Sequence, residues 1–277
     1  MRPAYARLHE KILSPRAIAP DAIGVETFPG GDAYYAYCLR HHSQSDLSAE
    51  EAHRLGLGEV ERLRGEILAA AADLGMPDGL TIAEICERAE RDGGTVVGEE
   101  TVERYRRIVE EASARLPEAF DRLPSIEVEG VGESIGACHR PPPLHGTRPG
   151  VFYAPLHREE PCYRMPTVAY REAVPGHHLQ IALTMEANLP TLRTLTRFNG
   201  YTEGWALYAE RLAWELGWYD DDPSGNLGRL CDEMMRTVRL VVDPAIDTMD
   251  WSFDEAVAYF HENTGKPIDV ARSHIYR

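Results

Sequence analysis

Two short segments of the chain hold the residues that could bind a metal ion and activate water. Residues 170–180 read Tyr-Arg-Glu-Ala-Val-Pro-Gly-His-His-Leu-Gln, and residues 202–210 read Thr-Glu-Gly-Trp-Ala-Leu-Tyr-Ala-Glu. A hydrolytic zinc site needs about three His, Asp or Glu ligands, an open position for water and a carboxylate base beside it. Residues of these types occur in both segments, at Glu172, His177 and Glu203.

The spacing within the first segment restricts which side chains can face a metal. His177 and His178 are adjacent, so on a regular helix they point about 100° apart and only one of them is expected to be a ligand. Pro175 and Gly176 must disturb the helix just before them, because proline lacks an amide donor and glycine loosens the turn. Glu172 comes within reach only if this break redirects the chain.

The second segment predicts a helix in which Glu203, Leu207 and Glu210 share one face. The 26 residues from His177 to Glu203 are enough for a helix, a loop and a return, so a helical hairpin could bring the two residues together. Packing explains the same patterns equally well. An adjacent His pair is also common at a helix end or in a core, and the Glu-Gly-Trp-Ala-Leu-Tyr run is also typical of an amphipathic packing face.

Composition excludes several classes of partner. The 277 residues carry a net charge of -16, which argues against nucleic acid or an anionic membrane as a partner. No apolar stretch approaches the roughly 18 residues of a membrane span, and the first residues lack the apolar region of a secretion signal. The five cysteines are scattered and contain no Cys-x-x-Cys pair, so we expect reduced cysteines and a cytoplasmic location.

Most of the chain predicts helices around one small sheet. Capping boxes at Ser48, Thr81 and Ser252 each precede an apolar stripe, and the first stripe comprises Leu57, Val60, Leu63, Ile67, Leu68, Ala71 and Leu74. Alternating residues at 125–129 and 151–154 predict strands. We therefore expect a single domain over residues 1–277, helical over 1–124, with a small sheet at about 125–155 and the motif helices at 160–277.

Taken together, the two segments resemble the signature of a large, mostly bacterial family of helical proteins known as domain of unknown function 885. That signature is similar to His-Glu-Ala-x-Pro-Gly-His-His-x-Gln followed by Glu-Gly-Trp-Ala-Leu-Tyr-x-Glu. Further stretches resemble landmarks of the same family along almost the whole chain: residues 28–35, 55–60, 148–150 and 239–243. The chain is therefore identified as a member of this family.

Members of this family resemble gluzincin-type zinc metallopeptidases. The resemblance implies a mainly α, zincin-like metallopeptidase fold with a small β-sheet beside the active-site helix, and zinc-dependent hydrolysis of peptide or amide bonds. It implies His177 and Glu203 as metal ligands and Glu172 as the general base. Around the ligands or the substrate it places Arg171, His178, Gln180, Tyr208, Glu210, Asp247 and His274.

The sequence departs from the family pattern at functional positions. Arg171 stands where the family has its first histidine ligand, and a guanidinium cannot ligate a cation. Asp247 and His274 also stand where the resemblance leads us to expect other residues, a histidine and a glutamate. Compared with the family, the chain looks like a core that is short at both ends. We expect zinc binding to be weak or absent.

Two functions remain open from the sequence. The first is a zinc-dependent hydrolase of peptides or small amides, impaired by Arg171, in which Asp247 or His274 could replace the lost ligand. The second is a non-catalytic pseudoenzyme or binding protein that retains the scaffold, with Arg171 paired to Glu172 or Glu203. In either case a partner chain could supply the missing helices.

Overall fold

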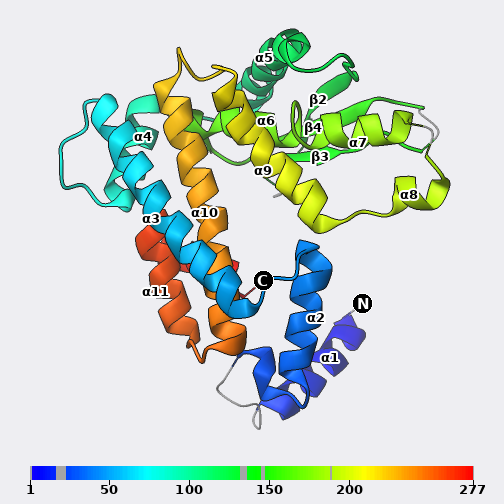
Figure 1. The fold of residues 1–277 in the computed structure, drawn as a ribbon, viewed down its shortest axis with the longest axis vertical. Helices are drawn as coiled ribbons and strands as arrows, with labels where there is room; N and C mark the ends of the chain where they lie inside the picture. The colour runs from blue at the N-terminus through cyan, green and yellow to red at the C-terminus, as the bar shows by residue number, and fades with distance from the viewer. Residues whose placement is uncertain (1, 17–22, 132–135, 145–146, 188, 277) are drawn as a thin grey trace.

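The protein is mainly α-helical and carries two small sheets. The computed structural model describes residues 2–16, 23–131, 136–144, 147–187 and 189–276 (Figure 1). In chain order the helices are α1 (Arg2–Arg16), α2 (Gly31–Ser43), α3 (Ala49–Asp73), α4 (Ile82–Gly93), α5 (Glu99–Arg115), α6 (Met165–Glu172), α7 (His177–Glu186), α8 (Thr191–Leu195), α9 (Asn199–Glu215), α10 (Pro223–Thr248), α11 (Phe253–Thr264) and α12 (Ile268–Ile275). The strands are β1 (Thr95–Val96), β2 (Ile126–Val131), β3 (Cys138–Arg140), β4 (Gly150–Pro155) and β5 (Glu160–Pro161).

The long helices α3 and α10 lie side by side and connect the two ends of the molecule (Figure 1). At one end α5, α6, α7 and α9 gather around the larger sheet. At the other end α2 lies near the last turns of α10, where the hydroxyl of Tyr35 donates to Asp243. Because α10 contacts α3, α6, α9 and α11, it links the main core to the helices that carry the two motifs.

The predicted capping boxes start three of the helices. Ser48 before α3, Thr81 before α4 and Ser252 before α11 each accept a bond from a backbone amide three residues on, and the Glu at that position reaches back. Each box satisfies amide groups that the first turn of a helix leaves without partners. These three predictions from the sequence are confirmed.

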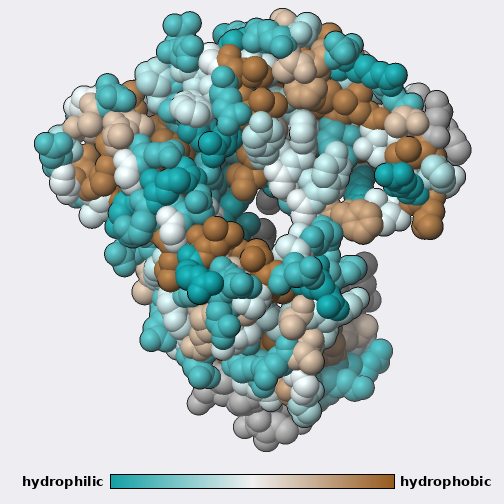
Figure 2. All heavy atoms as spheres, in the orientation of Figure 1, coloured by the Kyte–Doolittle hydropathy of each residue, from teal (hydrophilic) through white to brown (hydrophobic). Residues whose placement is uncertain are grey.

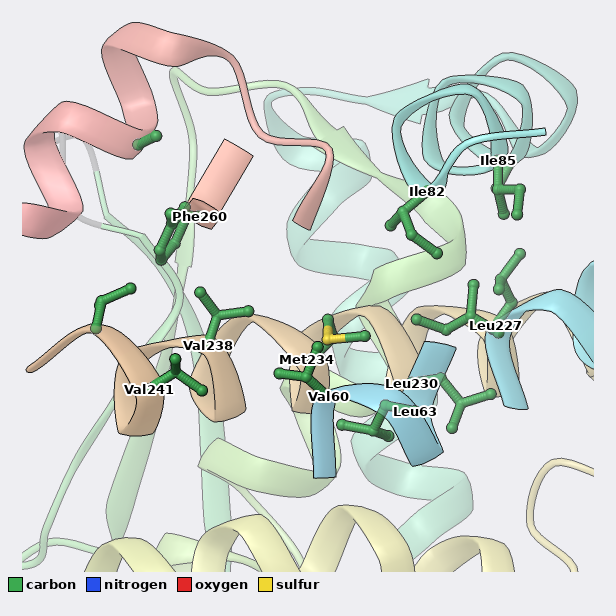
Figure 3. Packing of buried hydrophobic residues seen from close by; sticks show 14 of the residues in the cluster. Val60, Leu63, Ile82, Ile85, Leu227, Leu230, Met234, Val238, Val241 and Phe260 are labelled. Carbon is green, nitrogen blue, oxygen red and sulfur yellow. The ribbon is translucent and has the colours of Figure 1, made fainter. Parts of the chain in front are cut away.

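The main core lies where α3, α4, α10 and α11 meet (Figure 3). Its labelled members are Val60, Leu63, Ile82, Ile85, Leu227, Leu230, Met234, Val238, Val241 and Phe260. The apolar stripe predicted for α3 was too wide. Leu57 and Leu68 are 38% and 43% exposed, because α10 covers a narrower face of the helix than the apolar residues span.

The larger sheet has the strand order β2-β4-β3, with β2 parallel and β3 antiparallel to β4. Its strands confirm the alternating patterns seen at 125–129 and 151–154. The sheet lies next to α7, and Gly150 of β4 comes so close to it that an added Cβ would be 2.4 Å from Nδ1 of His178. The two-residue pairing of β1 with β5 was not predicted, since it joins segments about 65 residues apart by too few residues to leave a pattern.

All five cysteines are free, and the sulfur atoms of Cys86 in α4 and Cys231 in α10 are 3.5 Å apart. No helix in the described part of the chain is long and apolar enough to cross a membrane.

The narrow buried face of α3 can be tested with two leucines on the same helix. Leu63→Ala should lower the free energy of unfolding by about 2–5 kcal/mol, because Leu63 is fully buried and its loss leaves a cavity. Leu68→Ala, the matched control, should lower it by less than about 1 kcal/mol. Urea denaturation measures both values, and equal losses would show that α3 packs through the wider stripe.

Candidate functional site

The helix is interrupted between α6 and α7, as the pair of Pro175 and Gly176 predicts. Helix α6 ends at Glu172 and α7 begins at His177. Any side chain at residue 176 would meet the carbonyl oxygen of Arg171, because a Cβ there would be 1.9 Å from it. The indole Nε1 of Trp205 in α9 donates to the carbonyl oxygen of Pro175 over 2.9 Å, so the break is fastened to the second motif helix.

The guanidinium of Arg171 is the centre of the site. It is surrounded by three carboxylates: Nε lies 3.6 Å from Oε1 of Glu172, Nη1 lies 3.5 Å from Oε1 of Glu210, and Nη2 donates to Glu203. The Arg171 side chain is only 11% exposed, whereas that of Glu203 is 59% exposed. The sequence left Glu172 or Glu203 open as the partner of Arg171, and the structure places Arg171 next to both of them and to Glu210.

Glu210 continues this set of charges into the protein interior. Its carboxylate is 1% exposed, accepts a 2.6 Å bond from the hydroxyl of Thr167 in α6, and lies 3.2 Å from Nη1 of Arg236 in α10. A buried carboxylate without such partners would cost several kcal/mol. The face that Glu203 and Glu210 share on α9 is thus the face that meets both arginines.

Asp232 and Arg164 continue the series of alternating charges beyond Arg236. Its Nη1 donates to the carbonyl oxygen of Asp232 over 3.0 Å, and the carboxylate of Asp232 accepts a 2.7 Å bond from Nε of Arg164. Asp232 is 4% exposed at its side chain, and the nearby Arg164 and Arg236 lower its pKa although burial opposes this. The site is therefore one end of an ion-pair network rather than an isolated cluster.

The two adjacent histidines point in different directions, as helical geometry requires. His177 faces the charge cluster, with Nε2 3.6 Å from Oε2 of Glu203. His178 faces the sheet, where its Nδ1 lies 3.2 Å from Nε2 of His139 in β3. The backbone amide of His139 also donates to Oε2 of Glu172 over 3.2 Å, so the sheet holds this carboxylate in place.

Burial controls protonation in the site. It raises the pKa of Glu172 to about 7, and the nearby Arg171 opposes this only in part. Burial also lowers the pKa of His177 and of His178 to about 4, and that of His139 to about 3. At neutral pH these histidines are therefore uncharged, and the fixed positive charges next to the carboxylates are those of the arginines.

Four other positions singled out in the sequence lie away from this centre or at its edge. Gln180 follows His177 by one turn of α7 and donates from Nε2 to Oγ1 of Thr184 over 3.0 Å. Tyr208 donates to Oε2 of Glu215, farther along α9, over 3.2 Å. Asp247 accepts a 2.9 Å bond from the amide of Val25, and His274 of α12 stacks on Phe260 and bonds Arg239. The structure thus places Asp247 and His274 with other elements.

These residues do not fit a zinc ion. His177 and Glu203 converge, but the third side chain between them is that of Arg171, whose nitrogens are donors and carry a positive charge. In the described part of the chain, no group of three or more His, Cys, Asp or Glu residues could hold a metal ion.

Comparison with known protein families shows to which family the chain belongs. The profile of the family described as "Bacterial protein of unknown function (DUF885)" matches residues 1–277. The chain belongs to this family. A search of curated proteins gives no match to this DUF885 protein.

Two solved structures are similar to the DUF885 chain. One is a "putative lipoprotein" from Colwellia psychrerythraea, with 31% identity and a TM-score of 0.90 over 99% of this chain and 49% of the other. The second is a "putative lipoprotein of unknown function" from Shewanella oneidensis, with 15% identity and a TM-score of 0.78 over 99% of this chain and 53% of the other. The chain thus spans about half the length of these proteins, and the second likeness concerns the fold alone.

Sequence reasoning missed three residues that shape the site of this DUF885 protein: His139, Thr167 and Arg236. They come from a three-residue strand, from α6 and from α10, outside the two motif segments. No spacing rule links them to the motifs. Their role follows only from the structure, in which the buried Glu210 carboxylate needs partners such as Arg236 and the hydroxyl of Thr167.

Glu172 gives a pH-dependent prediction. Its folded pKa is about 7 rather than 4.5, so the stability due to the neutral carboxyl is fully present below pH 4.5 and is lost as pH rises through 7. Glu172→Gln should therefore gain stability relative to the parent as pH rises from 5 to 8, by on the order of 3 kcal/mol. Unfolding free energies at each pH unit measure this gain.

The control is Glu110→Gln, at an exposed position of α5. Because the Glu110 side chain is exposed, this variant should change the free energy of unfolding by less than about 0.5 kcal/mol. A constant difference between Glu172→Gln and the parent would show that the Glu172 carboxyl does not gain a proton on folding in this range.

Proposed function

We propose that this DUF885 protein is a non-catalytic binding protein of metallopeptidase-like ancestry, in which Arg171 provides the positive charge that a metal ion would provide in a hydrolase. The observation that carries the proposal is the guanidinium of Arg171 between the carboxylates of Glu172, Glu203 and Glu210. The zincin-like fold belongs to the same proposal. It is supported by a His-bearing helix that packs against a Glu-bearing helix beside a small sheet.

Charge balance supports the loss of metal binding. Arg171 and Arg236 already contribute two positive charges to Glu210 and the carboxylates next to it. A zinc ion between His177 and Glu203 would add two more positive charges within a few ångströms of a guanidinium that cannot lose its proton. Repulsion at such distances costs several kcal/mol at the effective dielectric of a protein.

A zinc-dependent hydrolase of peptides or small amides is the second candidate. It is favoured by Glu172, because a carboxyl with a pKa of about 7 suits a general base at neutral pH. It requires a third ligand, and the nearest side chain at that position is the guanidinium of Arg171. We therefore rank it below the binding protein.

Location and partners belong to the proposal as well. The two similar solved proteins are called lipoproteins, which supports a place in the cell envelope over the cytoplasmic location expected from the sequence. Because this chain spans only about half of each of them, a further domain or a partner chain that completes the protein remains part of our proposal.

Reversal of the central substitution tests the proposed function. Arg171→His should create a His, His, Glu set from residue 171, His177 and Glu203. Zinc at 100 times the Kd of this variant should then raise its free energy of unfolding by about 2.7 kcal/mol, since a ligand of the native state stabilises it. The parent should respond far less, and Glu203→Ala in the variant should remove the gain. Thermal unfolding with and without zinc measures each case.

The matched control is Arg211→His, which adds a histidine at a half-exposed position of α9 next to Glu215. It should respond to zinc as the parent does. Elemental analysis that finds one zinc per parent chain, after purification without added metal, would overturn the proposal in favour of the hydrolase. We expect the Arg171→His variant to bind zinc with little or no hydrolysis.

A further inference from the structure

A pocket of about 510 Å³ opens beside the Arg171 site. Its walls come from α7, from α8 and the segment that leads into α9, and from the loop at residues 141–144. It adjoins the site directly, because Gln180 lies one turn after His177 and Thr202 precedes Glu203. A volume of several hundred cubic ångströms is typical of sites for small ligands.

The pocket is mostly apolar. Its apolar side chains include Leu144, Ile181, Met185, Leu195, Phe198 and Tyr201. Three of these, Leu195, Phe198 and Tyr201, are more than half exposed, at 59%, 53% and 59%. Figure 2 shows hydrophobic surface over α8, at the edge of the molecule. An apolar ligand group would cover surface that is otherwise in contact with water.

The charges at the pocket are all of one sign. Among its described lining residues, Arg193 and Arg197 are the charged side chains, and no acidic one occurs. The chain as a whole has 45 acidic and 29 basic residues, so a purely cationic lining is the opposite of its average surface. In the part of the chain that the structure describes, neither guanidinium forms an ion pair or a side-chain hydrogen bond. Both are therefore available to an anionic group.

Gln180 adds a hydrogen-bond acceptor. Oγ1 of Thr184 donates to the carbonyl oxygen of Gln180 over 2.8 Å, so this hydroxyl can only accept from the Gln180 amide, whose Nε2 lies 3.0 Å away. That arrangement fixes the orientation of the amide. Its Oε1 is buried and has no hydrogen-bond partner among the described residues. An N–H donor that reached this oxygen would satisfy a group that is otherwise costly to bury.

We propose that this pocket binds an N-acylated apolar amino acid, free or at the C-terminus of a peptide. Its carboxylate pairs with Arg193 and Arg197, its amide N–H donates to Oε1 of Gln180, and its side chain lies on the apolar wall. This assignment rests on the proposed binding role of the protein, and it names the ligand of the pocket beside the Arg171 site.

The neighbouring charges support an anion in this place. Arg193 and Arg197 lie only four residues apart in the segment that runs from α8 toward α9, and both line the pocket. A fatty acid would satisfy the arginines and the apolar wall, but it would leave the acceptor of Gln180 without a donor. The combination of two cations with one unpaired acceptor therefore favours an acylated amino acid.

Four ligands test the proposal by titration calorimetry on the parent chain with a chelator present. N-acetylphenylalanine should bind, and its C-terminal amide should bind at least about ten-fold more weakly, because a charge-assisted contact is lost. The O-acetyl ester analogue, which replaces N–H by oxygen, should bind several-fold more weakly. Hexanoate should bind more weakly than N-acetylphenylalanine.

Variants then assign the contacts. Arg193→Gln and Arg197→Gln should each weaken the binding of N-acetylphenylalanine about ten-fold. The control, Arg211→Gln, removes the same charge from α9 outside the pocket and should leave the affinity for N-acetylphenylalanine within about two-fold of the parent value. Gln180→Leu should bind N-acetylphenylalanine and the ester analogue equally. Circular dichroism of each variant confirms that a lost affinity is not a lost fold.

The length of the ligand distinguishes its two possible sources, a free acylated amino acid and the C-terminus of a peptide. A tripeptide that ends in phenylalanine binds at least about ten-fold more tightly than N-acetylphenylalanine if the source is a peptide, and no more tightly if it is a free acylated amino acid. Both results keep the carboxylate and amide contacts. No binding with a Kd below about 1 mM, or equal affinity for hexanoate, would overturn the proposal. Since the chelator excludes metal, this outcome is independent of the zinc test of Arg171.

Discussion

The structure around the two motifs depends on one buried guanidinium. Arg171 brings together carboxylates from its own helix and from α9, and each of these would repel the others without it. Because Glu210 is almost fully buried, its carboxylate needs the neighbouring Arg171 and Arg236 as partners. A bound metal can leave, whereas an arginine side chain cannot, so the charge balance of this site does not vary with the supply of metal.

Helix α10 connects this cluster to the rest of the fold. Asp232 and Arg236 lie one turn apart and take part in the ion pairs with Arg164 and Glu210. Between and around them, Leu230, Met234 and Val238 pack into the main core. The position of the site is therefore fixed by the same helix that holds α3, α4 and α11 together, and a shift of α10 would disturb both.

Local signals in the sequence predict the elements better than they predict their contacts. The capping boxes depend on four neighbouring residues, so Ser48, Thr81 and Ser252 could be recognised directly. Which leucines of α3 are buried depends on how much of that helix α10 covers. The prediction that Leu68 belongs to the buried stripe was therefore wrong. The same limit applies to the site. The sequence could offer Glu172 or Glu203 as a partner of Arg171, but only the tertiary fold brings His139 and Arg236 to the site.

A guanidinium and a zinc ion share a positive charge but differ in what that charge can do. Zinc has an open coordination position that lowers the pKa of bound water, whereas a guanidinium offers only N–H groups that donate hydrogen bonds. Replacement of the metal by Arg171 would thus keep the attraction for carboxyl and carbonyl oxygens while it removes the means to activate water. Glu172 would retain a pKa suited to a base, with no activated nucleophile beside it. Under the proposed function, such a site favours recognition without hydrolysis, and a neighbouring cationic pocket adds a second point of contact for the same kind of ligand.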